Sequence, residues 1–306
     1  MKILFLVNSS ASSVTPRSRV VIRKALSADH DVTLAETARR GHATRLAQGA
    51  VAAGTDVVVV LGGDGTLNEA ANGLAGSNTA LAALPGGSTN VFARTIGLPN
   101  DPIEATGQLL DALAQRSIRR VGLGSVNGRY FMFHTGVGFD AAVVAQVEKR
   151  SSLKRYAGHP LFVYAGFATW LRHYDRSRPH FAVEHLSGDV IDDGYLTIVM
   201  NTNPYTYLGN RPLDLSPETT LDNGLAAVTL RTMRFDRTIR VVGSALGTGK
   251  ALRSSRWVDH RTDLAGLTVR AHSPVPYQVD GDHLGEGTRF TFRHAPDVLD
   301  LVLPVG

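Results

Sequence analysis

Short apolar runs alternate with segments of helical apolar spacing along the first third of the chain. The runs lie at residues 2–7, 31–35, 56–61 and 80–84, and each is rich in aliphatic or β-branched residues, as buried parallel strands are. The segments between and after them predict helices at about 17–26, 41–53, 67–74 and 103–115. Strands that alternate with helices in this way predict an open α/β sheet.

The pattern changes after Arg120. Residues 121–126 and 129–134 read as a hairpin around Asn127-Gly128, a pair typical of a type I′ turn. Short strand signals follow at 181–186, 194–200, 226–231, 267–271, 277–279 and 288–292, which favours a β-sandwich-like domain. A last strand at 298–302 is expected to return to the first domain. We therefore predict an α/β domain over residues 1–122, with 295–306 returning to it, and a β-rich domain over 123–294.

Composition narrows the class of protein. The chain has 306 residues, of which 43% are hydrophobic and 19% charged, as in a soluble globular protein of two domains. It has no cysteine, so disulfides and thiolate metal sites are excluded. The N-terminal apolar run is too short for a signal peptide, and no apolar run reaches the length of a membrane span. The net charge of +5 suits an anionic partner such as a nucleotide or an acidic membrane face.

Candidate chemistry is concentrated where the third strand ends, at Gly62-Gly63-Asp64-Gly65-Thr66. Glycines between a strand and a helix let the backbone approach a phosphate, and N–H groups at the helix start face the anion. Asp64 is expected inside this turn, where a carboxylate suggests a divalent cation beside the phosphates or a base. The fourth strand ends in a second glycine loop, Pro85-Gly86-Gly87-Ser88, that leads into a helix. Strand ends with such loops predict a ligand crevice at one sheet edge.

These motifs resemble the nucleotide-binding signature shared by diacylglycerol, sphingosine and ceramide kinases, NAD kinases and, more distantly, phosphofructokinases. The continuation Leu67-Asn68-Glu69 is similar to the lipid-kinase branch, as are 85–94, 136–141 and 222–225. The resemblance implies an N-terminal sheet like that of NAD kinase and phosphofructokinase, and it implies ATP and Mg²⁺ as cofactors. It implies ATP contacts at Asn8, Ser10, Thr37, Gly62, Gly63, Asp64, Gly65, Thr66, Leu67, Asn68 and Ser88, with Mg²⁺ held near Asp64 through the phosphates.

Two segments of the second domain carry further expectations. Gly136, Gly138 and Ala141 fit a dinucleotide-binding pattern, but no acidic strand end follows about 20 residues later, so the lipid-kinase pattern fits better. In bacterial diacylglycerol kinases a turn of sequence Asp-Asp-Gly holds a structural Mg²⁺. The matching ligands here are Thr220, Asn223 and Leu225, and Asn223 replaces an aspartate, which weakens or removes that metal site.

Asp280-Gly281-Asp282 resembles the family's Asp-Gly-Glu, whose acidic end is taken as the base on the lipid hydroxyl. In an extended strand both aspartates point to one side, and paired carboxylates can raise one pKa toward general-base work. Asp282, or Asp280, is therefore the expected base, with Asp64 as the third catalytic candidate. A hairpin turn on the surface is the alternative for this segment.

A basic and aromatic segment around residues 161–171 suggests contact with an anionic membrane, with a core helix as the alternative. Taken together, the sequence predicts an ATP-dependent lipid kinase, cytoplasmic and peripheral at the inner membrane face, with diacylglycerol as the first acceptor to consider. An NAD kinase-like enzyme and a non-catalytic nucleotide- or lipid-binding protein are the alternatives. No nucleic-acid partner is expected, and the oligomeric state, including a homodimer, stays open.

Overall fold

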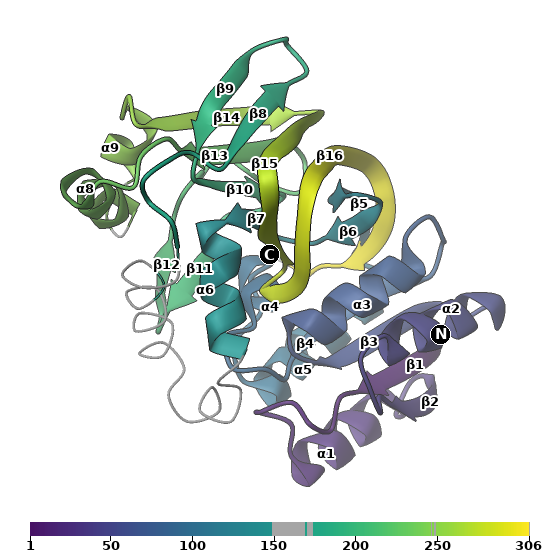
Figure 1. The fold of residues 1–306 in the computed structure, drawn as a ribbon. Coiled ribbons are helices and arrows are strands. Elements are labelled where there is room, and N and C mark those ends of the chain that lie inside the picture. The colour runs from purple at the N-terminus through teal and green to yellow at the C-terminus, as the bar shows by residue number, and fades with distance from the viewer. Residues whose placement is uncertain (149–168, 170–173, 246, 248, 306) are drawn as a thin grey trace. The chain divides into compact units, whose positions relative to one another are not determined.

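The structure is a computed structural model that describes residues 1–148, 169, 174–245, 247 and 249–305 (Figure 1). The chain divides into two compact units. The first unit comprises Met1–Leu123 together with Pro296–Gly306, and the second comprises Gly124–Ala295.

The first unit is a parallel sheet with helices between its strands. Its elements are β1 (Lys2–Val7), α1 (Pro16–Leu26), β2 (Asp31–Glu36), α2 (His42–Ala52), β3 (Val57–Gly62), α3 (Asp64–Leu74), β4 (Ala80–Pro85), α4 (Val91–Thr95) and α5 (Pro102–Ala114). The strand order is β2-β1-β3-β4, all parallel. The end of β16 (Asp282–Val302) joins next to β4, where Leu301 pairs with Leu81.

The predicted strands and helices of this unit are confirmed, with one correction. Every residue of β3 and β4 is buried, as their continuous apolar runs predict. Helix α3, however, begins at Asp64 and not at Leu67, so Asp64 is its first residue and does not lie in a turn. The sequence suggested otherwise because the three residues after Gly62 are Gly63, Asp64 and Gly65, and both residue types are typical of turns.

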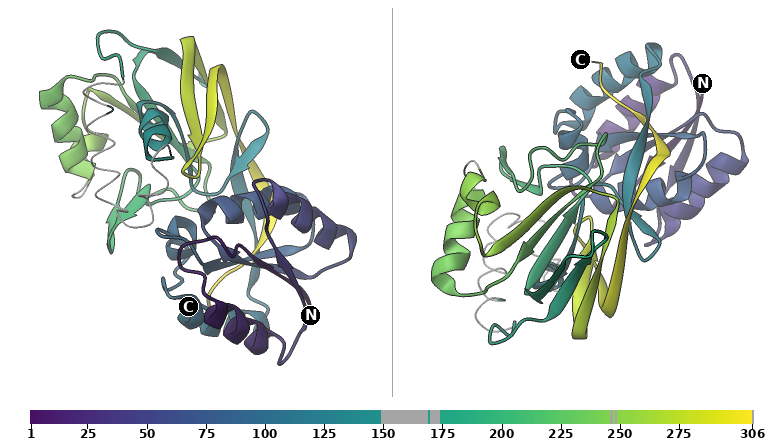
Figure 2. Two further views of the ribbon diagram at one scale, coloured as in Figure 1. Left: turned by 60° about the horizontal axis from the view of Figure 1, so that its bottom comes forward. Right: turned by 90° about the horizontal axis from the view of Figure 1, so that it is seen from above.

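The second unit is strand-rich and mainly antiparallel. It holds β5 (Ile118–Val126), which enters from the first unit, β6 (Arg129–Phe131), β7 (His134–Gly138), α6 (Phe139–Glu148), β8 (Phe181–His185), β9 (Val190–Gly194), β10 (Leu196–Met200), β11 (Thr206–Leu208), β12 (Arg211–Leu213), β13 (Leu225–Leu230), α8 (Phe235–Ala245), α9 (Lys250–Arg253), β14 (Val258–Leu264), β15 (Gly266–Val279) and most of β16. The main path is β14-β13-β10-β7-β15-β16. Helix α8 lies at an outer side of this unit in both views of Figure 2.

Two predictions for this unit change. The runs 267–271 and 277–279 belong to one strand, β15, in which the pairing with β16 is shifted between Arg270 and Val275. The runs 288–292 and 298–302 likewise belong to the single strand β16, which begins in the second unit and ends in the first. The Asn127-Gly128 turn is confirmed, since φ is 49° and 85° at these residues, as a type I′ turn requires.

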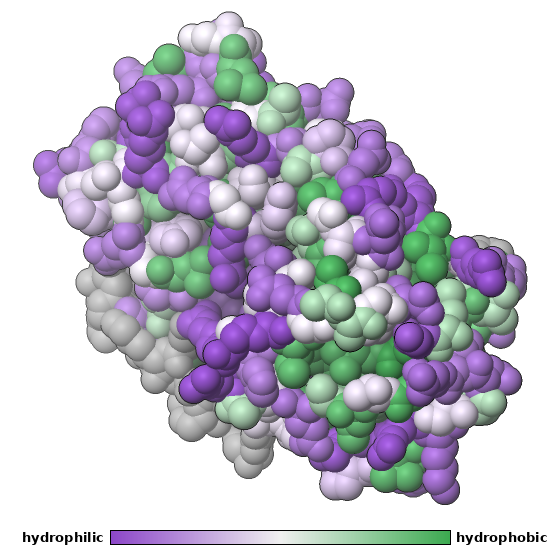
Figure 3. Space-filling model, turned by 90° about the vertical axis from the view of Figure 1, so that its right-hand side faces the viewer, coloured by the Kyte–Doolittle hydropathy of each residue, from purple (hydrophilic) through white to green (hydrophobic). Residues whose placement is uncertain are grey.

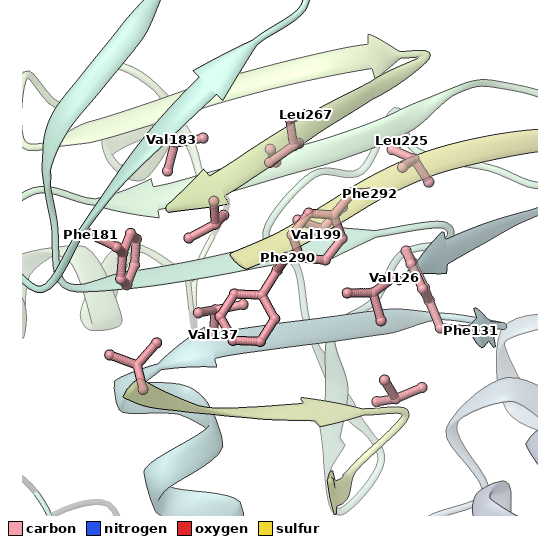
Figure 4. Close-up of a cluster of buried hydrophobic side chains, with 14 residues drawn as sticks. Val126, Phe131, Val137, Phe181, Val183, Val199, Leu225, Leu267, Phe290 and Phe292 are labelled. Carbon is pink, nitrogen blue, oxygen red and sulfur yellow. The ribbon is translucent and has the colours of Figure 1, made fainter. Parts of the chain in front are cut away.

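The core of the second unit contains phenylalanine rings from several strands within one cluster of buried apolar side chains (Figure 4). Phe131, Phe181, Phe290 and Phe292 are all at most 1% exposed. Two rings lie over glycines: a Cβ on Gly124 would lie 2.1 Å from the Phe131 ring, and one on Gly194 would lie 2.3 Å from Phe181. The glycines therefore make room for the aromatic core.

Figure 3 shows one face of the molecule, on which polar residues alternate with apolar patches. The segment 161–171, considered above for membrane contact, lies outside the described residues apart from Thr169. No helix in the described part of the chain is both long and apolar enough to span a bilayer.

Helices α2 and α3 approach each other at Gly73, which gives a test of the packing. A Cβ there would lie 2.6 Å from the Thr44 carbonyl oxygen and 2.8 Å from the Ala47 Cβ, whereas a Cβ on Gly107 of α5 meets nothing within 4 Å. Gly73→Ala should therefore lower the free energy of unfolding by about 1–3 kcal/mol. Gly107→Ala, its control, should raise that free energy by roughly 0.5–1 kcal/mol. Urea unfolding of both variants measures the difference, and equal effects would contradict the close approach.

Candidate functional site

The loops after β1 and β3 meet at the carboxyl edge of the first unit's sheet. The Asn8 side-chain amide donates to the Thr66 hydroxyl at 2.9 Å, and the Asn8 backbone N–H donates to the Leu61 carbonyl at 3.0 Å. Because β1 lies between β2 and β3, the chain reverses its direction of winding between β1 and β3. Ligands of open α/β sheets bind at such a switch point.

The two glycine loops lie back to back. The Gly86 N–H donates to the Gly62 carbonyl at 2.9 Å, and a Cβ on Gly86 would lie 2.8 Å from the Gly62 nitrogen. A Cβ on Gly87 would lie 2.8 Å from the Gly63 Cα. Glycines are needed here because the two backbones touch. The first loop joins them, since the Ser13 N–H donates to the Gly86 carbonyl at 2.9 Å.

Asp64 holds the second glycine loop to the central helix. Its two carboxylate oxygens accept the N–H groups of Val91 at 3.0 Å and Phe92 at 3.1 Å, the first two residues of α4. A carboxylate at a helix start satisfies N–H groups that have no partner inside the helix. The first role of Asp64 in this structure is therefore to cap α4 across 27 residues of sequence.

Glu69 does the same for α2. Its carboxylate accepts the Gly41 N–H at 2.7 Å and the Ala43 N–H at 3.2 Å. Glu69 belongs to a motif that resembles the lipid-kinase branch, but the sequence does not predict its role, because its partners lie 26 and 28 residues away. Both acidic residues of α3 thus stabilise the starts of neighbouring helices.

The N-cap residue of helix α3 makes no side-chain cap bond. Among the five helices described in the first unit, Thr15 caps α1 and Asp101 caps α5, while Glu69 and Asp64 cap α2 and α4. Gly63, the N-cap residue of α3, has no side chain with which to do so. The positive end of a helix that lies at the switch point and begins after a glycine is suited to an anion such as phosphate.

The other predicted nucleotide residues fall into two groups. Ser10 and Ser88 are exposed in the loops after β1 and β4, where they can reach a ligand. Leu67 and Asn68 are 5% and 2% exposed, so their side chains belong to the core and only their backbone groups suit contact. Thr37 follows β2, and its N–H donates to the Val7 carbonyl at 2.9 Å.

Asp280 and Asp282 do not share one side of an extended strand, so that prediction is wrong. Asp280 and Gly281 have φ of 47° and 80° and form the turn between β15 and β16, across which Val279 pairs with Asp282. The Asp280 carboxylate is buried and accepts the N–H groups of Met132 at 2.8 Å, Phe133 at 3.0 Å and His134 at 3.1 Å. Asp280 is therefore a structural residue, whereas Asp282 is half-buried at the start of β16.

A chain of buried hydrogen bonds leads to this turn. The Gln278 amide donates to one Asp140 oxygen at 2.8 Å, and its carbonyl oxygen accepts the Gly281 N–H at 2.8 Å. The other Asp140 oxygen accepts the Tyr205 hydroxyl. Asp140 thus fixes the orientation of Gln278, and Gln278 fixes the residue that precedes Asp282.

Burial is the main cause of the pKa shifts of Asp140, Tyr205 and His134. It raises the pKa of Asp140, although hydrogen bonds from Tyr205 and Gln278 oppose the shift. It also raises the pKa of Tyr205 well above its usual value, with the Asp140 charge adding to the rise. The His134 ring, 4.4 Å from the Tyr205 ring, has its pKa lowered to about 3 by burial and is neutral at ordinary pH.

The Gly-x-Gly-Phe-Asp-Ala motif has a packing explanation. A Cβ on Gly136 would lie 1.8 Å from the nearer Asp140 oxygen, so only glycine leaves room for that carboxylate. Gly138 has a φ of 83°, which turns the chain from β7 into α6. Strand β7 pairs antiparallel with β10 and β15, so this segment is not the parallel unit that a dinucleotide site requires.

The turn considered for a structural metal is closed by hydrogen bonds. The Asn223 side-chain amide donates to the Glu218 carbonyl at 2.9 Å, its N–H donates to the Thr220 carbonyl at 3.3 Å, and the Gly224 N–H donates to Asp263 at 2.9 Å. An amide donor here satisfies a carbonyl that a cation would otherwise need. Among the described residues no group of three His, Cys, Asp or Glu side chains could hold a metal. The metal site at Thr220, Asn223 and Leu225 stays a prediction, because none of these ligands is a His, Cys, Asp or Glu side chain.

Comparison with known proteins gives one match to the N-terminal part of the chain and others along its whole length. Residues 2–126 match the diacylglycerol kinase catalytic domain. A protein of Pseudomonas aeruginosa named "Probable lipid kinase YegS-like" is 29% identical over 99% of this chain and 94% of its own length. The diacylglycerol kinase of Bacillus subtilis is 36% identical over 39% of each chain.

Two solved structures share the fold. A diacylglycerol kinase from Bacillus anthracis has a TM-score of 0.69 and 19% identity over 99% of this chain and 96% of that one. An NAD kinase from Archaeoglobus fulgidus in complex with ATP has a TM-score of 0.54 and 12% identity over 99% and 94%. The catalytic-domain match over residues 2–126 and the lipid-kinase relatives along the whole length make the chain similar to the bacterial diacylglycerol kinase and lipid kinase family.

Proposed function

We propose that this protein transfers the γ-phosphate of Mg-ATP to a lipid hydroxyl. The observation that carries the proposal is the start of α3, which lies at the switch point between β1 and β3 and has a glycine, Gly63, as its N-cap residue. The phosphates would lie against its first turn, with Asn8, Ser10 and Ser88 at the rim. Mg²⁺ would arrive with the nucleotide, and it would offset the charge on the phosphates.

Asp282 is the base in this proposal. Asp280 is occupied by three backbone N–H groups, and Asp282, half-buried at the start of β16, is the other carboxylate of this motif. The acceptor oxygen attacks the γ-phosphorus, its proton passes to the Asp282 carboxylate, and the bond to the β-phosphate oxygen breaks to release ADP.

Diacylglycerol is the acceptor that we propose, which gives phosphatidate as product. The family that residues 2–126 match and the Bacillus subtilis relative both carry that name. The relatives that cover the whole chain are named only as lipid kinases, so the test must offer other lipid hydroxyls as well. An NAD kinase-like activity is the second candidate, and NAD belongs in the same assay.

Asn8→Asp tests the nucleotide site. The new carboxylate can still accept from the Ser10 N–H, as Asn8 does at 3.1 Å, and can accept from the Thr66 hydroxyl, so the fold should persist. Its charge would face the phosphates, and ATP affinity should fall by about tenfold or more. Calorimetric titration measures the affinity, and urea unfolding checks that stability is retained. Unchanged affinity would place the phosphates elsewhere.

Asp282→Asn and Asp280→Asn separate catalysis from structure. Asp282→Asn should abolish transfer of labelled phosphate from Mg-ATP into a total lipid extract, with ATP affinity and stability unchanged. Asp280→Asn should lower the free energy of unfolding by about 1–3 kcal/mol, because one buried N–H then meets an amide donor. Transfer that survives in Asp282→Asn would remove it as the base. Label found in NAD and not in lipid would favour the second candidate.

Asp140 acts in this proposal as a positioning residue, and a charge exchange tests it. In Asp140→Asn one carboxylate oxygen becomes an amide donor, so either the Tyr205 hydroxyl or the Gln278 amide loses its acceptor. The orientation of Gln278, and with it the bond to the Gly281 N–H, is then no longer fixed, and turnover should fall about tenfold. When Asp140→Asn is combined with Gln278→Glu, the amide introduced on α6 donates to one oxygen of the carboxylate introduced on β15, and the Gly281 N–H donates to the other. The double variant should recover kcat at unchanged KM for ATP. Failure of the rescue, with both variants folded, would argue against positioning.

A further inference from the structure

Helix α8 shows an apolar stripe to solvent. Phe235, Ile239 and Val242 are 53%, 54% and 53% exposed, and their spacing places them along one side of the helix. The helix is attached through another side, where Ala245 is buried in the hydrophobic core and Val241 packs against it. We call the three exposed residues the α8 stripe. Single exposed apolar residues need no explanation, but a stripe of three along a helix indicates a partner.

The segment that contains the α8 stripe has a net charge equal to that of the whole chain. Residues 234–257 contain six basic residues, Arg234, Arg237, Arg240, Lys250, Arg253 and Arg256, against one acidic residue, Asp236. The chain as a whole carries +5, so the rest of the sequence is balanced. A positive region of this kind attracts a surface of many negative charges.

Trp257 lies at the edge of this region between two arginines. The Arg237 guanidinium carbon is 3.5 Å from the ring centroid, and that of Arg256 is 4.5 Å away. A half-buried tryptophan in contact with cations suits the headgroup layer of a bilayer, where indole rings are enriched. Apolar stripe, basic excess and tryptophan therefore agree on one kind of partner.

We propose that α8 and the adjoining Trp257 turn dock this protein on an anionic phospholipid surface. The α8 stripe enters the boundary of the acyl chains, and the arginines contact lipid phosphates. A neutral protein partner would have no use for the basic excess. The inference rests on the proposed function in that a lipid kinase must reach a membrane-bound acceptor, but docking itself needs no turnover.

Co-sedimentation of the full chain with vesicles tests the inference without ATP. The protein should bind vesicles of phosphatidylcholine mixed with phosphatidylglycerol, bind phosphatidylcholine alone far more weakly, and lose binding as salt rises. Ile239→Glu with Val242→Glu should weaken binding about tenfold or more. Arg240→Gln should weaken it about fivefold. Ile103→Glu, at a residue 43% exposed on α5, is the matched control and should change nothing.

Several results would overturn the inference. They are no preference for the anionic vesicles, full binding by the stripe variant, or equal loss in the Ile103→Glu control. A stripe variant that changes only the sedimentation mass in solution would assign the α8 stripe to contact between copies of the chain. Binding to vesicles with no phosphate transfer to any lipid would leave the docking surface in place and reject the proposed function.

Discussion

Two carboxylates on one helix hold the candidate nucleotide site together. Asp64 and Glu69 of α3 each accept two backbone N–H groups at the start of a neighbouring helix, α4 and α2. These contacts fix the loop after β4 and the loop after β2 relative to the central helix. They also satisfy two helix starts internally, whereas the N-cap residue of α3, Gly63, has no side chain with which to cap its helix.

The glycines of the loops after β3 and β4 have two roles in this arrangement. Gly86 and Gly87 allow their loop backbone to touch that of Gly62 and Gly63, which is a packing requirement that needs no ligand. They also leave the α3 start open to an anion, which is a chemical use of the same geometry. The same double role appears in the second unit, where Gly136 makes room for Asp140 and Asp140 in turn orients the hairpin turn before Asp282.

Local patterns predicted the elements of the first unit well, because its strands are continuous apolar runs such as 57–61 between clear turn residues. They failed where structure depends on distant partners. Residues 272–274, His-Ser-Pro, interrupt the strand pattern of β15, yet the strand continues through a shift in its pairing with β16. In the sequence Asp280 and Asp282 look like equivalent carboxylates. In the structure the Asp280 carboxylate accepts three N–H groups from residues almost 150 positions earlier, which makes it a structural residue. No spacing rule reveals such contacts.

The long strand β16 has a consequence for how the protein is made. The first unit contains both the earliest residues of the chain and the last, since Val298 accepts the Gly76 N–H and Leu301 pairs with Leu81. The Arg120 side chain of the same unit also donates a hydrogen bond to the Asp297 carbonyl. On the ribosome, the edge of β4 therefore stays uncovered until the end of β16 has emerged, which follows the whole of the second unit. The second unit can assemble while its neighbour is still missing a strand, so emergence of β16, and not emergence of the nucleotide motifs, sets the moment at which the first unit closes.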